Sequence, residues 1–102
     1  MILIADSGTT KTDWRWIQKS GQIIQIKTQG ISPTYQNQEE ILKTLQNELL
    51  SQVNAPVEKV FFYGTGCSAP DKAQIVNDAI QIIFPQAVIE VEHDLLAAAR
   101  AL

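Results

Sequence analysis

The first dozen residues constrain the fold most strongly. Residues 2–5 form a continuous apolar run, which is typical of a strand covered on both faces, and the run ends directly in the turn signal Asp6-Ser7-Gly8. Such a strand belongs in the middle of a sheet. From residue 12 to residue 17 the pattern changes to alternation, with Trp14 and Trp16 on one side, which predicts a half-buried second strand.

The remaining pattern adds a third strand and then alternates helices with strands. A turn at residues 19–22 leads into a strand at 23–28, so the first three strands form an antiparallel meander. Helices are expected from residue 37 to 53, from 70 to 84 and from 95 to 102, and strands at 57–63 and 87–91. Because two helices are crossovers, the last two strands run parallel to the first. The fold class is therefore α/β, a ribonuclease-H-like mixed five-stranded sheet in the order β-β-β-α-β-α-β-α.

Composition limits what this chain can be. Its 102 residues suffice for one domain, and the last expected helix has no capping residue, so we expect a piece of a longer protein. The single cysteine, Cys67, excludes an intrachain disulfide and a cysteine-based zinc site. A net charge of -3 with scattered basic residues argues against nucleic acid or a membrane surface as a partner. We expect a cytoplasmic protein; a homodimer is compatible with the sequence, which does not fix the oligomeric state.

The strongest chemical signal is the turn after the first strand. It contains Ser7, Gly8, Thr9, Thr10, Lys11 and Thr12. Hydroxyls and turn N–H groups can donate to a phosphate chain, Gly8 allows a positive φ and close approach, and Lys11 adds positive charge. Asp6 can hold Mg2+ through water. The alternative is an ordinary hairpin with a structural aspartate. The turn is not a Walker A loop, because the glycine and lysine spacing is wrong and a strand follows it.

A second signal follows the fifth expected strand. Asp94 comes just after Glu92 and His93, and parallel strands would bring Asp94 and Asp6 to the same edge of the sheet. Asp94 can act as a general base or as a plain helix N-cap. We interpret His93, the single histidine, as a surface residue or as one that supports a neighbouring ligand-contacting residue.

A third signal is the segment Gly64-Thr65-Gly66-Cys67-Ser68-Ala69 between a strand and a helix. It approximates the dinucleotide fingerprint G-x-G-x-x-A. That interpretation leaves the turn at residues 6–12 unexplained. Cys67 at a helix start could be a nucleophile, but no base accompanies it, so a packed small residue is the better interpretation. Tyr35, in the turn-rich segment 30–35, either contacts a substrate or covers the sheet edge.

The order of these motifs resembles a known family. Residues 1–14, Gly30-Ile31-Ser32-Pro33, residues 62–67 and residues 94–100 are similar to segments of the BadF/BadG/BcrA/BcrD-type ATPases and the related N-acetylglucosamine kinases, in the actin, Hsp70 and sugar-kinase superfamily. Ser32 stands where many relatives have asparagine.

The resemblance implies the N-terminal lobe of an ATP-dependent sugar kinase that uses ATP and Mg2+. It implies that residues 7–12 bind phosphate, that Asp6 faces Mg2+, and that Asp94 takes the proton of the sugar hydroxyl. The sugar would be N-acetylglucosamine or a similar amino sugar, and its contacts would come from Ser32, Thr34, Tyr35, Gly64, Gly66 and Cys67. The resemblance also implies a C-terminal lobe outside these residues, so we expect the 102-residue chain alone to be inactive.

Two rival functions remain open at this stage. A metal-dependent nuclease on the same fold would need clustered carboxylates, for which Asp6, Asp94 and Glu48 are the candidates, although the chain lacks a basic groove. A non-catalytic nucleotide sensor would keep the lobe without the chemistry.

Overall fold

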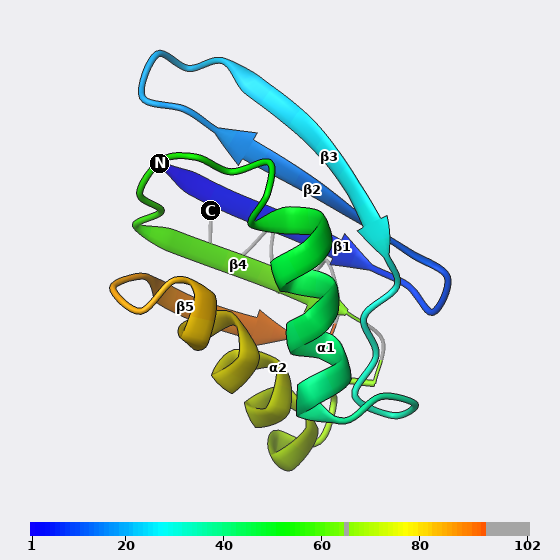
Figure 1. The fold of residues 1–102 in the computed structure, drawn as a ribbon. Helices are drawn as coiled ribbons and strands as arrows, with labels where there is room; N and C mark the ends of the chain where they lie inside the picture. The colour runs from blue at the N-terminus through cyan, green and yellow to red at the C-terminus, as the bar shows by residue number, and fades with distance from the viewer. Residues whose placement is uncertain (65, 94–102) are drawn as a thin grey trace.

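The computed structural model describes residues 1–64 and 66–93, and its sheet has the predicted topology (Figure 1). The five strands lie in the order β3-β2-β1-β4-β5. Strand β1 pairs parallel with β4 and antiparallel with β2, and β5 extends the parallel side. The predicted fold class, an α/β ribonuclease-H-like sheet, is confirmed. The strand bounds are β1 (Ile2–Ser7), β2 (Lys11–Ile17), β3 (Ile23–Gln29), β4 (Lys59–Gly64) and β5 (Val88–Glu92).

The helical segments are α1 (Gln38–Thr44), η1 (Leu45–Leu49) and α2 (Pro70–Ile83). Helix α1 begins with a capping box, in which the Asn37 side chain accepts from the Glu40 N–H and the Glu40 side chain accepts from the Asn37 N–H. The expected single helix to residue 53 is wrong in its second half. The chain widens there into the π-helical segment η1, whose Leu45 carbonyl accepts from the Leu50 N–H at 2.8 Å.

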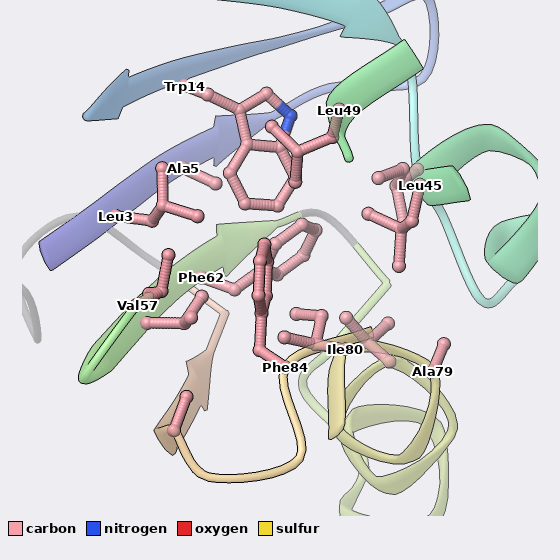
Figure 2. Close-up of a cluster of buried hydrophobic side chains, with 14 of the residues drawn as sticks. Leu3, Ala5, Trp14, Leu45, Leu49, Val57, Phe62, Ala79, Ile80 and Phe84 are labelled. Atoms are coloured by element: carbon pink, nitrogen blue, oxygen red, sulfur yellow. The ribbon is translucent and has the colours of Figure 1, made fainter. Parts of the chain in front are cut away.

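The core lies between the sheet and the two helices, which sit side by side on one face of it (Figure 1). Leu3 and Ala5 of β1 are fully buried there, together with Trp14 and Phe62, whose rings meet at 6.0 Å and 55° (Figure 2). Each large side chain buried in this way stabilises the fold by about 1.5–3 kcal/mol. The tryptophans are therefore core residues, as their alternation predicted.

The opposite face of the sheet is more polar. On β1, Ile4 is half-buried and Asp6 is exposed. Among the described residues, the expectation that β1 is covered on both faces is therefore confirmed only for the face that packs against the helices. No helix in the described part of the chain is long and apolar enough to span a membrane. The expected third helix and Asp94 lie outside the described residues.

Candidate functional site

The candidate site is centred on the β1–β2 turn (residues 8–10), at the carboxyl end of the central strand. The Gly8 N–H donates to the Lys11 carbonyl at 2.8 Å and closes the turn. Thr9, Thr10 and Lys11 are exposed, so their hydroxyl and ammonium groups are open to a ligand. A shallow hollow of about 320 Å³ lies at this point, lined by Asp6, Ser7, Gly8, Thr10, Lys11 and Asp13. Hydroxyls, backbone N–H groups and one cation together suit an anion such as a phosphate.

Two of the predicted phosphate ligands face inward instead. Ser7 is 3% exposed and Thr12 is fully buried, and their hydroxyl oxygens lie 2.7 Å apart. The Ser7 hydroxyl also lies 2.9 Å from the Ile31 carbonyl and accepts from the Ile31 N–H at 3.1 Å. The expectation that four hydroxyls face the ligand is therefore corrected: Ser7 and Thr12 support the turn from below, and Thr9 and Thr10 remain available.

Gly8 also differs from expectation. Positive φ values occur at Gly21 and Gly66 among the described glycines, so Gly8 does not need the left-handed region. A Cβ added at Gly8 would meet a single atom within 4 Å, the Lys11 carbonyl oxygen, at 3.7 Å. The protein itself would tolerate a side chain here. Close approach of a ligand to the bare backbone is the remaining chemical reason for glycine.

Asp6 points to the sheet face away from the helices, and it has a charged neighbour. It lies directly opposite Asp13 of β2 and beside Tyr63 of β4. Like charges in opposite strand positions repel, and the Asp13 Oδ1 atom is buried without a hydrogen-bond partner. The described residues contain no group of three or more His, Cys, Asp or Glu side chains placed to hold a metal ion. Mg2+ does not require such a group, because it keeps several waters and binds through one or two carboxylates, which Asp6 fits.

Sequence reasoning missed Asp13 as a neighbour of Asp6. The signal was present, because Asp13 alternates with the buried tryptophans and so must face the same side as Asp6. Glu92 of β5 pairs with Tyr63. The four side chains therefore form one row across the sheet, in the order Asp13, Asp6, Tyr63 and Glu92. Burial of Tyr63 raises the pKa of its hydroxyl, and the negative charges of Glu90 and Glu92 raise that pKa further. The phenol therefore stays neutral beside these carboxylates.

The β3–α1 loop (residues 30–37) lies next to the turn and meets the segment after β4. Gly66 has φ +82°, and a Cβ there would come within 2.5 Å of the Thr34 hydroxyl and 3.0 Å of the Ser32 hydroxyl. Ser32 is buried, whereas Thr34 and Tyr35 are exposed, Tyr35 by 76%. The structure thus brings together three of the residues predicted to contact substrate, Ser32, Thr34 and Gly66. Tyr35 extends from the same loop into solvent.

Gly64 and Cys67, also predicted to contact substrate, are packing residues in this structure. A Cβ at Gly64 would lie 2.6 Å from the Phe62 ring, so the glycine is required by the core. Cys67 is 4% exposed, and burial raises its pKa to about 11. Burial and the raised pKa favour a packed residue over a nucleophile at this position. Thr65 lies outside the described residues.

The fold also weighs against two rival interpretations. A dinucleotide-binding sheet of the Rossmann kind is mostly parallel, whereas β2 and β3 are antiparallel here. Glu48, the third carboxylate that a nuclease would need, accepts from the Gln29 N–H at 2.9 Å. It lies on η1, on the helix side of the sheet, and Asp6 is on the other side. Glu48 and Asp6 therefore do not share a metal.

The chain is similar to proteins of known structure. All of this chain matches the crystal structure described as "the Putative N-acetylglucosamine Kinase" from Porphyromonas gingivalis, with 44% sequence identity and a TM-score of 0.84. The chain spans 37% of that protein. No family model matches the sequence, and no curated protein matches it.

Proposed function

Because this chain is N-acetylglucosamine kinase-like in sequence and fold, we propose that it is the N-terminal lobe of an ATP-dependent kinase for N-acetylglucosamine or a similar amino sugar. The observation that carries the proposal is the open β1–β2 turn. Its exposed hydroxyls and Lys11 lie at the carboxyl end of the central parallel strand, where sheets of this kind bind ligands.

Phosphoryl transfer asks a protein mainly to hold the phosphate chain and the attacking oxygen in line and to balance charge. In the proposal the turn N–H groups, Thr9 and Thr10 donate to phosphate oxygens, and Lys11 balances their charge. Asp6 would hold a hydrated Mg2+, which would supply positive charge to balance the phosphates. The Ser32 and Thr34 side of the β3–α1 loop, together with Gly66 and Tyr35, faces the sugar.

Asp94 is the proposed general base. It would accept the proton of the sugar hydroxyl as that oxygen bonds to the γ-phosphorus and the bond from phosphorus to ADP breaks. Since this chain corresponds to 37% of its structural neighbour, the rest of the ATP site is proposed to come from a second lobe outside these 102 residues. The chain alone is then inactive and binds Mg-nucleotide weakly.

The test is a product assay on the intact protein that contains this chain. ATP, Mg2+ and N-acetylglucosamine are supplied, and ADP and sugar phosphate are measured together. Asp94→Asn should abolish turnover and keep ATP binding, while Asp78→Asn, at an exposed aspartate on α2, should leave turnover unchanged. An intact protein that binds ATP and forms no sugar phosphate, whether residue 94 is aspartate or asparagine, would instead be the non-catalytic sensor. Sugar phosphorylation that continues at the wild-type rate in Asp94→Asn would contradict the role of Asp94 as the base.

A further inference from the structure

The β1–β2 turn and the β3–α1 loop of the proposed site are held together beneath their exposed tips by backbone contact and buried hydrogen bonds. At Gly30, the backbone of the β3–α1 loop rests directly on the β1–β2 turn, where an added Cβ would come 2.4 Å from the Thr9 carbonyl oxygen and 2.5 Å from that of Gly8. One residue further on, Ile31 binds the Ser7 hydroxyl through both its N–H and its carbonyl. The turn and the loop therefore cannot move independently without breaking buried hydrogen bonds.

We call the hydrogen-bonded contact of Ser7, Thr12 and Ile31 the junction. A count of hydroxyl protons shows how its hydrogen bonds are satisfied. The Ser7 and Thr12 hydroxyls supply two protons for three close contacts: with each other, with the Ile31 carbonyl and with the Gln29 carbonyl. If Thr12 donates to Ser7, Ser7 can donate to the Ile31 carbonyl, and its two lone pairs accept from Thr12 and the Ile31 N–H. The Gln29 carbonyl is still served by Thr28, whose hydroxyl lies 3.1 Å away. In this arrangement every buried hydroxyl proton has an acceptor.

Thr28 shares the Gln29 carbonyl with Thr12, so its hydroxyl belongs to the same arrangement. A buried hydroxyl outside the junction is found on helix α1. Thr44 is 8% exposed, and its hydroxyl donates to the Glu40 carbonyl at 3.4 Å. Thr44 therefore provides a control for the loss of one buried hydroxyl.

We propose that Ser7 and Thr12 are positioning residues that fix the sugar-facing loop relative to the phosphate-binding turn. This inference rests on the proposed function. Each loop would still bind its own ligand without the junction, but the sugar oxygen and the γ-phosphate would no longer be held in line. Water then competes with the sugar: ATP and water give ADP and phosphate, whereas ATP and the sugar hydroxyl give ADP and sugar phosphate.

The decisive measurement is the ratio of ADP formed to sugar phosphate formed by the intact protein. Thr12→Val keeps the side-chain shape and removes the hydroxyl, while Thr12→Ser keeps the hydroxyl. Thr12→Val should lower kcat for sugar phosphorylation by about 10-fold or more with little change in the KM for ATP, because misplacement of about 1 Å costs up to about 100-fold. It should also raise the ratio of ADP to sugar phosphate. Ser7→Ala should act in the same direction more strongly, and Thr12→Ser should restore wild-type values.

The control is Thr44→Val, which removes a buried hydroxyl outside the junction. It should leave the product ratio and the KM for ATP unchanged. If Thr44→Val raises the ratio as much as Thr12→Val does, or if Thr12→Val leaves the ratio and kcat at wild-type values, the positioning role is refuted.

Amide hydrogen exchange separates failure of this inference from failure of the proposed function. In Thr12→Val, exchange at the Ile31 and Gly8 amides should accelerate together, and in Thr44→Val it should not. A wild-type protein that shows joint protection of these amides but no sugar phosphorylation has the junction without the proposed activity, so the positioning role falls with that activity. If the protein is active but exchange at the Ile31 and Gly8 amides changes independently, the junction is refuted and the proposed function is not.

Discussion

Replacing Gly30 by alanine tests the contact between the β3–α1 loop and the β1–β2 turn. The added Cβ would lie 2.4 Å from the Thr9 carbonyl oxygen, where ordinary contacts begin at 3.4 Å, so the backbone must move by roughly 1 Å. Overpacking of this kind costs about 1–3 kcal/mol, and alanine recovers about 0.4–1 kcal/mol from the unfolded state. The middle of the two ranges, about 2 and about 0.7 kcal/mol, leaves an expected loss of about 1.3 kcal/mol, which in a domain of this size lowers Tm by roughly 5–10 °C.

Urea and thermal unfolding measure this difference, and Gly8→Ala is the matched control. A Cβ at Gly8 would make one ordinary contact, at 3.7 Å from the Lys11 carbonyl oxygen, and Gly8 has no positive φ, so its alanine variant should keep or slightly raise the free energy of unfolding. Equal stabilities for Gly30→Ala and wild type would mean that the β1–β2 turn does not lie against the β3–α1 loop. The argument that the two segments move together would then be wrong.

Two further predictions concern the segment after β4. Gly66→Ala should destabilise the protein by about 2–4 kcal/mol in chemical unfolding, because it adds a left-handed backbone penalty to contact with the Thr34 and Ser32 hydroxyls; an unchanged midpoint would contradict the packing of these two segments. For Cys67, burial raises the pKa of the thiol to about 11. Because the folded protein holds this proton more tightly than the unfolded chain, the stabilisation is full below the ordinary pKa of 9.0 and is lost as the pH rises towards 11. Thiol labelling should therefore be slow at pH 8 and faster after unfolding, and equally fast labelling of the folded protein would refute the burial.

Much of the fold could be predicted because hydrophobic periodicity is set by burial. The alternation at Trp14 and Trp16 placed β2, and the crossover helices gave the parallel pairing of β1 with β4 and of β4 with β5. The π-helical end of the first helix could not be predicted. It depends on Leu45 and Leu49 packing against a distant sheet and on Glu48 reaching the Gln29 N–H.

The sequence indicated which turn is the candidate site but not which of its side chains face outward. A run of hydroxyl residues in a turn does not say which of them face a ligand. Alternation does: Ser7 continues the buried side of β1 after Leu3 and Ala5, and Thr12 precedes Trp14 and Trp16 on the buried side of β2. Applied to residues 6–13, that rule separates inward Ser7 and Thr12 from outward Asp6 and Asp13. Ser7 and Ile31 lie 24 positions apart in the sequence, so their hydrogen bonds could be found only from the structure.

The most direct test is the effect of Gly8→Ala on ATP-dependent sugar phosphorylation by the intact protein. The variant should fold with wild-type stability and lose about 10-fold or more in kcat/KM for ATP, because its methyl group occupies the space through which a phosphate would approach the backbone. Wild-type kcat/KM for ATP in a stable Gly8→Ala protein would contradict the assignment of this turn to phosphate.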